Sequence, residues 1–211
     1  HTMFEIAHSL HRQFGGDPWC IYRGLHLLSF ADNHDVSRLA TILSDPGCIR
    51  PAYGLLFGMP GIPCVYYGSE WGREGQKGGG DDWALRPAFD EPAPNELTAW
   101  VGRLIGARTG RDERGALAPG ARALCYGSYR NVQIASEQLL FERVAEGWDG
   151  QPGDRVLVAV NASGQPASVQ AGELNGSFRD LLADGASAAG AVALNGALEL
   201  APYETRYRLA C

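Results

Sequence analysis

The sequence predicts an α/β segment followed by an all-β segment. Two apolar runs, at about residues 25–31 and 62–67, are each expected to form a strand that ends in a cluster of polar residues, and helical patterns separate them. Strands joined through helices pair in parallel, and polar strand ends are typical of the mouth of an α/β barrel. After residue 111 short apolar runs alternate with turn residues, which indicates an antiparallel β-sandwich. We therefore expect part of a TIM-type (β/α)8 barrel over residues 1–110 and a β-sandwich domain over residues 111–211.

Four helices are predicted in the first segment, over residues 3–14, 37–43, 51–59 and 95–108. Apolar residues at helical spacing define the first, third and fourth of these helices. Two consecutive glycines, Gly15 and Gly16, end the first helix, and Asn95 is a favourable N-cap for the last. Gly54 and Gly58 lie inside the third helix, where they indicate close packing against a neighbouring element.

Six strands are predicted in the second segment, at about residues 123–129, 139–144, 156–161, 178–182, 198–200 and 205–209. Turns rich in Gly, Asp, Asn and Pro separate these runs. Because the period changes after the helix over residues 95–108, we place the domain boundary near residue 111.

The composition argues against several classes of partner and cofactor. The net charge is −6 and the sequence contains no cluster of Lys and Arg, so we expect no nucleic-acid partner. No apolar run approaches the length that spans a bilayer, so we expect no membrane partner. The five cysteines are scattered without C-x-x-C spacing, which argues against a zinc site and favours a reducing compartment such as the cytoplasm. The glycines at positions 78–80 are not followed by the Lys-Ser/Thr pair of a phosphate-binding loop. We expect neither a metal nor a cofactor.

Two motifs carry the polar residues that follow the predicted strands. Residues 30–38 read F-A-D-N-H-D-V-S-R, and residues 61–72 read G-I-P-C-V-Y-Y-G-S-E-W-G. The pair F-x-D-N-H-D-x-x-R and G-I-P-x-x-Y-Y-G-x-E-x-G resembles barrel strands seven and eight of the alpha-amylase superfamily of glycoside hydrolases. The resemblance covers about residues 22–110, and an all-β domain after the last barrel helix is also the layout of that family.

The resemblance implies that Asp35 is the carboxylate that stabilises the transition state of a retaining α-glucan-acting hydrolase, with His34 as its companion. The chemistry of the two residues fits this role, because hydrogen bonds to sugar hydroxyls that tighten in an oxocarbenium-like transition state lower the barrier. The implied substrates are α-glucans of the starch, maltooligosaccharide and glycogen class. The alternative is a solvated turn in which Asp35 caps the helix that begins near Ser37.

The long loop over residues 68–94 is expected to grip the substrate. Asp82 and Arg86 stand four residues apart and would offer a charged acceptor and a planar donor fork to sugar hydroxyls; the alternative is an exposed salt bridge. Trp83 would stack on a sugar or pin the loop, and Tyr67 would form a wall of the site. Arg38 is expected to pair with Asp35 or Asp32 and hold the turn.

The sequence departs from the family pattern in one important respect. A retaining glycosidase needs a nucleophile and a general acid, and in this superfamily both arise on earlier strands for which residues 1–25 have no room. We therefore expect the chain to be the C-terminal portion of such an enzyme, to need the missing N-terminal barrel portion as a partner, and to be inactive alone. The alternatives are a non-catalytic glucan-binding module and a structural protein that kept the scaffold, although a pure binding module would not need His34 and Asp35 at a strand end.

Overall fold

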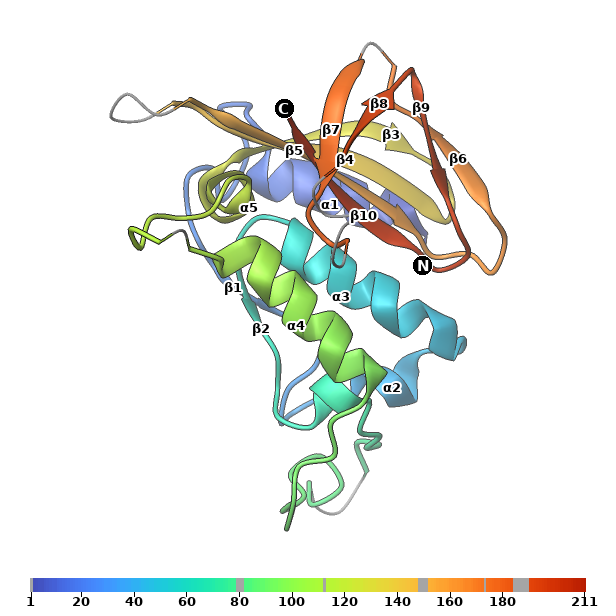
Figure 1. Ribbon diagram of the computed structural model, residues 1–211. Helices are drawn as coiled ribbons and strands as arrows, with labels where there is room; N and C mark the ends of the chain where they lie inside the picture. The colour runs from blue at the N-terminus through green and yellow to red at the C-terminus, as the bar shows by residue number, and fades with distance from the viewer. Residues whose placement is uncertain (1, 79–81, 112, 148–151, 173, 184–189) are drawn as a thin grey trace.

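The computed structural model describes residues 2–78, 82–111, 113–147, 152–172, 174–183 and 190–211. These residues form a mixed α/β structure in which helices lie on one side of a multi-stranded antiparallel sheet (Figure 1). The helices are α1 (Met3–Phe14), α2 (Leu39–Ile42), α3 (Ile49–Gly58), α4 (Glu96–Thr109) and α5 (Ala121–Tyr126), with 3-10 turns η1 (Pro46–Cys48) and η2 (Ser69–Trp71). Among the described residues, no helix has both the length and the apolar character that crossing a membrane requires.

The two motif-bearing strands pair side by side in the same direction. Strand β1 (Leu28–Phe30) runs parallel to β2 (Ile62–Cys64), with Leu28 opposite Ile62 and Phe30 opposite Cys64. This confirms the predicted parallel pairing, but each strand has three residues and is shorter than the predicted runs. Within the described residues the two strands pair only with each other, so each strand has one paired edge and one unpaired edge.

Helices α3 and α4 form where the sequence predicts them. Asn95 caps α4, because its Oδ1 accepts from the backbone N–H of Leu97 at 2.9 Å and of Thr98 at 3.2 Å, and the Thr98 hydroxyl accepts in return from the Asn95 N–H. The glycines of α3 lie against the sheet. A Cβ on Gly54 would stand 2.4 Å from Thr205 Oγ1, and one on Gly58 would stand 2.8 Å from Val158 Cγ1, so the predicted close packing is confirmed.

The sheet after residue 127 is antiparallel and six-stranded, in the order β3-β4-β5-β10-β7-β8. Its strands are β3 (Ser128–Ile134), β4 (Gln138–Ala145), β5 (Asp154–Asn161), β7 (Gly176–Asp180), β8 (Ala191–Leu194) and β10 (Thr205–Ala210). A separate two-stranded sheet pairs β6 (Ala167–Gln170) with β9 (Ala197–Leu200). Strands β6 and β8 were not predicted.

The prediction of a strand over residues 123–129 was wrong. Residues 121–126, A-R-A-L-C-Y, form helix α5, and strand β3 begins at Ser128. Short apolar runs do not separate a buried strand from a buried helix, and Ala, Arg and Leu are strong helix formers. The buried Ala123 and Leu124 then hold the helix against the sheet.

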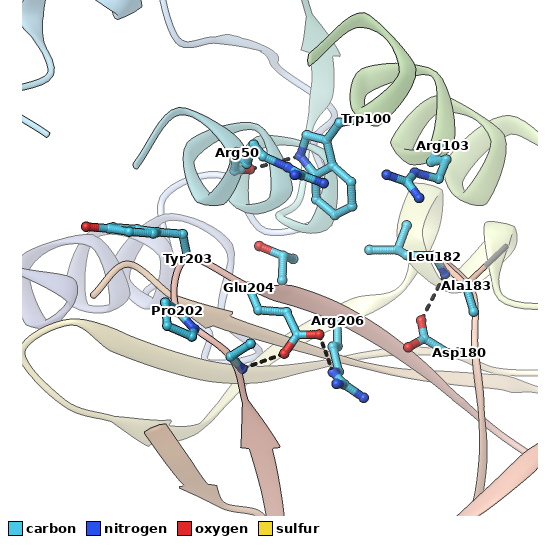
Figure 2. A pocket seen from close by; sticks show the side chains of 12 residues that line it. Arg50, Trp100, Arg103, Asp180, Leu182, Ala183, Pro202, Tyr203, Glu204 and Arg206 are labelled. Carbon is cyan, nitrogen blue, oxygen red and sulfur yellow. Dashed lines mark hydrogen bonds and ion pairs between the residues drawn. The ribbon is translucent and has the colours of Figure 1, made fainter. Parts of the chain in front are cut away.

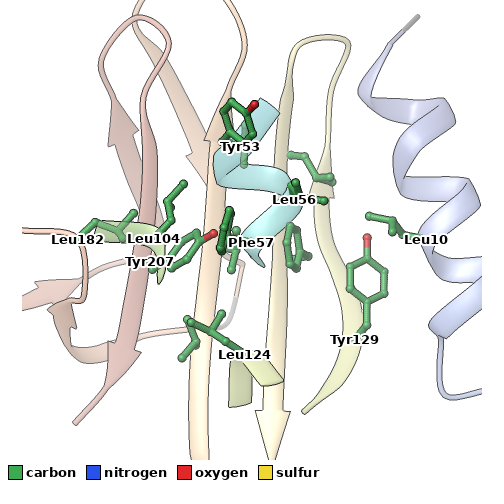
Figure 3. Close-up of a cluster of buried hydrophobic side chains, with 14 of the residues drawn as sticks. Leu10, Tyr53, Leu56, Phe57, Leu104, Leu124, Tyr129, Leu182 and Tyr207 are labelled. Atoms are coloured by element: carbon green, nitrogen blue, oxygen red, sulfur yellow. The ribbon is translucent and has the colours of Figure 1, made fainter. Parts of the chain in front are cut away.

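Both faces of the central strands of the six-stranded sheet are buried, and successive residues of these strands point into different cores. Val156, Val158 and Val160 of β5 join the larger core, which the helices cover, and Figure 3 shows Leu56 and Phe57 of α3 at its centre. Leu157 and Ala159 join a second core on the opposite face, which β6 and β9 cover. The larger core contains residues from both sides of position 111, and the predicted domain boundary stays a prediction.

Two buried arginines tie the C-terminal end of α3 to the rest of the molecule. Arg108 of α4 donates to the carbonyls of Phe57, Met59 and Gly61, and Arg143 of β4 donates to the Gly58 carbonyl at 2.8 Å. Burial, with the charge of Arg108 as the second cause, lowers the pKa of Arg143 to about 9. The arginines satisfy carbonyls that the end of a helix leaves without partners, and they fix the approach of the chain to β2.

Candidate functional site

Asp32 organises the turn that follows β1. Its side chain is 2% exposed, and its Oδ2 accepts from the backbone N–H of Leu39 at 2.7 Å, at the start of α2. The Ser69 hydroxyl donates to the same carboxylate at 2.8 Å, which joins the turn to the end of the second motif. Asp32 therefore supplies the helix cap that the alternative interpretation assigned to Asp35, and the Asp35 carboxylate lies elsewhere.

Arg38 lies fully buried beneath the site and does not form the predicted ion pair. Among the described residues neither Asp32 nor Asp35 forms a salt bridge with it. Its guanidinium instead donates to the Tyr67 carbonyl at 2.9 Å, the Ser69 hydroxyl at 2.9 Å and the Leu85 carbonyl at 2.8 Å. It also stacks on the Tyr66 ring, 4.2 Å from the centroid. Arg38 thus attaches the beginning of the loop over residues 68–94, and its later part at Leu85, to the turn after β1.

The predicted catalytic pair lies together with the predicted loop residues. His34 Nε2 is 3.2 Å from Asp35 Oδ2, and Arg86 Nη2 donates to Asp35 Oδ1 at 3.1 Å. The same Arg86 nitrogen lies 3.3 Å from Asp82 Oδ2, and Arg86 Nε donates to the His34 carbonyl at 3.2 Å. The side chains of His34 and Asp35 are more than half exposed. The structure therefore brings four of the six predicted site residues into one cluster that solvent can reach.

Tyr67 and Trp83 lie at the edge of this cluster. The Tyr67 hydroxyl donates to the Pro87 carbonyl at 2.9 Å, so this side chain holds the loop, and its role as a wall of the site stays a prediction. Trp83 is 75% exposed, which leaves most of its indole open to solvent. Away from the cluster, His26 packs edge-on against Tyr126 with ring centroids 5.4 Å apart.

Two tyrosines near the site, Tyr53 and Tyr66, have raised pKa values. Burial raises the pKa of Tyr53, and the charge of Asp32 adds to the effect; its hydroxyl donates to the Ser69 carbonyl at 3.1 Å. Partial burial also raises the pKa of Tyr66, whose ring centroid is 6.2 Å from that of His34. Arg86 lies between the carboxylates of Asp35 and Asp82, and Lys77 Nζ donates to the Asp35 carbonyl at 2.7 Å.

Sequence reasoning missed three residues that hold the site, namely Asp32, Ser69 and Tyr66. Asp32 and Ser69 belong to the two motifs, but their roles depend on a contact across 37 residues of sequence. Tyr66 also belongs to the second motif, and it is the ring on which Arg38 stacks. Among the described residues, no group of three or more His, Cys, Asp or Glu side chains could hold a metal ion, and all five cysteines are free thiols.

Comparison with known proteins finds similarity in structure but not in sequence. No family model matches the chain, and no curated protein is similar to it in sequence. The solved Anoxybacillus alpha-amylase superposes with a TM-score of 0.68 at 20% identity, over 98% of this chain and 45% of that one. The alpha-amylase from Geobacillus thermoleovorans, solved with acarbose, superposes with a TM-score of 0.64 at 21% identity. The match covers 87% of this chain and 39% of that enzyme. The gamma-CGTase from alkalophilic Bacillus clarkii superposes with a TM-score of 0.61 at 23% identity. The match covers 86% of this chain and 26% of that enzyme.

The resemblance inferred from the two motifs is thus confirmed at the level of the fold. The similar structures are alpha-amylase family glycoside hydrolases, and this chain spans less than half the length of each.

Proposed function

We propose that the chain is the C-terminal portion of a retaining, α-glucan-acting glycoside hydrolase. In this proposal β1 and β2 are the last two strands of a (β/α)8 barrel, and the sheets after residue 127 form the sandwich-type C-terminal domain. Asp35 stabilises the transition state with His34 beside it. Asp82, Arg86, Tyr67 and Trp83 hold the sugar, and the nucleophile and general acid come from the missing barrel portion.

The contact between Arg86 and Asp35 carries this proposal. The two residues are 51 positions apart, yet their side chains meet at 3.1 Å at the end of two parallel strands. A carboxylate held beside a histidine and a guanidinium offers acceptors and donors to neighbouring sugar hydroxyls, and such hydrogen bonds stabilise an oxocarbenium-like state. An isolated surface salt bridge would not require Asp32, Arg38 and Ser69 to build a buried support beneath it.

The exposed face of the parallel pair supports the need for a partner portion. Leu28 is 62% exposed, Phe30 47% and Ile62 53%, although all three lie in strands. A two-stranded sheet does not bury such residues by itself, whereas additional barrel strands would cover them and complete the ladder. We expect the partner to be the N-terminal barrel portion of the same enzyme.

The test is hydrolysis of maltooligosaccharides by the intact enzyme that contains this chain. Asp35→Asn in that enzyme should lower kcat by at least about a hundredfold with a smaller change in KM, because its charge acts mainly in the transition state. Asp17→Asn, on the connection between α1 and β1, is the matched control and should leave kcat unchanged. Near-normal turnover by the Asp35→Asn enzyme would exclude the assigned role.

A second assay uses the chain alone. We expect no hydrolysis by it, and measurable turnover would contradict the need for a missing portion. Trp83 is highly exposed and could stack on a sugar, so the non-catalytic glucan-binding alternative is tested in the same assay series. Saturable maltooligosaccharide binding by the chain alone, together with unchanged kcat in the intact Asp35→Asn enzyme, would favour that alternative.

A further inference from the structure

Lys77 is the only lysine of the 211-residue sequence, in which arginine supplies every other residue of the Lys and Arg class. It lies in the loop over residues 68–94 and is exposed to solvent. Its ammonium Nζ donates to the main-chain carbonyl of Asp35 at 2.7 Å, although the two residues are 42 positions apart. The single lysine of the chain therefore contacts the main chain of the residue to which the proposed function assigns transition-state stabilisation.

The backbone next to Lys77 is bound to the turn that follows β1. The Gly75 carbonyl accepts from the backbone N–H of Arg38 at 2.8 Å, and the Gly75 N–H donates to the Thr41 hydroxyl at 2.8 Å. The Lys77 N–H itself donates to the Ser37 hydroxyl at 2.9 Å. Because these bonds already fix the backbone of Lys77, less conformational entropy is lost when its long side chain binds an acceptor on the same turn.

The main chain of Asp35 is held on both sides of its Cα atom. Its N–H donates to Asn33 Oδ1 at 2.8 Å, and its carbonyl accepts from Lys77. Two fixed peptide groups set the direction of the Cα–Cβ bond, so that only the side-chain torsions of Asp35 remain free. Arg86 Nη2 and His34 Nε2, which lie 3.1 and 3.2 Å from the two carboxylate oxygens, restrict those torsions. Lys77 thus completes a set of contacts that holds an exposed carboxylate in one orientation.

A second cation of the same loop binds the preceding carbonyl of the turn. Arg86 Nε donates to the His34 carbonyl at 3.2 Å, next in sequence to the Asp35 carbonyl that Lys77 binds. Hydrogen bonds from charged donors are stronger than those from neutral donors. The two cations differ in one respect, because Arg86 also pairs with carboxylates, whereas Lys77 forms no ion pair among the described residues. The contact of Lys77 with the site is therefore a contact with its main chain.

Two arginines elsewhere in the molecule show how this contact differs from ordinary packing of a cation. Figure 2 shows a polar cleft between α3, α4 and β10, in which Arg206 pairs with Glu204 at 2.8 Å. The guanidinium carbon of Arg50 in the same cleft lies 5.0 Å from the centroid of the Trp100 ring. The first contact is local to β10 and the second joins α3 to α4, and the candidate site takes part in neither. Lys77 differs because its partner belongs to the candidate site.

We propose that Lys77 is a positioning residue for Asp35. Its ammonium holds the Asp35 carbonyl, and through it the carboxylate, in the orientation that the reaction needs. This role rests on the proposed hydrolase function. A carboxylate that stabilises a transition state acts through preorganised geometry, and a displacement of about 1 Å can cost about a hundredfold in rate. Because Lys77 acts on Asp35 and not on the sugar, its loss should lower kcat and leave KM nearly unchanged.

The first experiment tests the contact by NMR spectroscopy of the whole chain, without substrate. The Asp35 carbonyl belongs to the same peptide group as the Val36 N–H, so the amide nitrogen resonance of Val36 reports the bond from Lys77. Lys77→Met should shift this resonance, and Lys77→Arg, which keeps a charged donor, should shift it less. Arg73→Met, which removes an exposed cation from the same loop, is the matched control and should leave it in place. An unmoved Val36 resonance in Lys77→Met would overturn the inference and leave the hydrolase proposal standing.

The second experiment measures hydrolysis of maltooligosaccharides by the intact enzyme that contains this chain. Lys77→Met should lower kcat about tenfold and keep KM within about twofold of the unmodified enzyme, because the orientation of the catalytic carboxylate changes while the sugar contacts remain. Lys77→Arg should keep kcat within about threefold, because a guanidinium also donates to a carbonyl. Arg73→Met should change neither constant. Asp35→Asn is measured in parallel as the reference for loss of the carboxylate charge.

The kinetic outcomes separate the role of Lys77 from the hydrolase function. A normal kcat in Lys77→Met beside a collapsed kcat in Asp35→Asn would overturn the role of Lys77 alone. A raised KM with an unchanged kcat would mean that Lys77 binds the sugar and does not position Asp35. Equal losses of kcat in Lys77→Met and Lys77→Arg would also contradict the inference, since arginine keeps the donor. Near-normal turnover by Asp35→Asn would overturn both proposals.

Discussion

The parallel pair β1–β2 and the six-stranded sheet differ in how much of their packing the chain itself provides. Both faces of the sheet are covered, and Leu157, Val158 and Ala159 in its centre are fully buried. In the parallel pair Leu28, Phe30 and Ile62 remain about half exposed or more. The sheet is therefore packed on both sides by elements of this chain, whereas the parallel pair is not. The parallel pair is held in place from outside by Arg108, by Arg143 and by the turn around Asp32. The strands β1 and β2, which lead to the candidate site, thus form next to a sheet and helices that bury only part of their side chains.

The largest expected effect compares two phenylalanines, one from each region. Phe141 of β4 is fully buried and Phe30 of β1 is 47% exposed. Phe141→Ala should lower the free energy of unfolding by about 3–5 kcal/mol, because it removes a large side chain from a closed core. Phe30→Ala should lower it by less than about 1 kcal/mol. Urea unfolding followed by circular dichroism measures both, and equal losses would show that the parallel pair is as well packed as the sheet.

A second comparison uses two arginines of the site. Arg38 is buried and bonds to two carbonyls and a hydroxyl, whereas Arg86 is exposed and pairs with carboxylates. Arg38→Met should cost about 2–4 kcal/mol, because buried acceptors lose their donors. Arg86→Met should change stability by less than about 1 kcal/mol, as is usual for exposed ion pairs.

Limited proteolysis gives an independent measure of the same comparison. The loop over residues 68–94 is attached to the turn through Arg38, so Arg38→Met should make trypsin cleave at Lys77 faster than in the unmodified chain. Arg86→Met should leave that rate nearly unchanged. Unchanged cleavage in Arg38→Met would mean that other contacts hold the loop.

Local signals in the sequence predicted the elements that depend on local physics. The cap of α4 was predictable because the side chains of Asn95 and Thr98 each accept a hydrogen bond from the backbone N–H of the other, within four residues of sequence. The parallel pairing was predictable because helical patterns separate the two apolar runs that form the strands. Helix α5 was mispredicted because the apolar run 123–126 suits either structure until the sheet packs on it. The role of Arg38 was mispredicted because its partners lie 29, 31 and 47 residues away. The sequence analysis placed Arg86 and Asp35 in the same site, but it did not predict that their side chains contact each other.

The smallest expected effects come from two helical glycines that differ in their surroundings. Gly54 of α3 faces Thr205 of β10, and a Cβ there would lie 2.4 Å from Thr205 Oγ1 and 2.7 Å from its Cγ2. Gly102 of α4 has nothing within 4 Å of the same position. Gly54→Ala should therefore destabilise the fold by about 1–3 kcal/mol through overpacking. Gly102→Ala should stabilise it by about 0.5–1 kcal/mol, because alanine favours the helix and loses less backbone entropy. Thermal unfolding of the two variants should give shifts of opposite sign. A stabilising Gly54→Ala would mean that α3 can move away from the sheet, and that the close contact between Gly54 and Thr205 is not a rigid one.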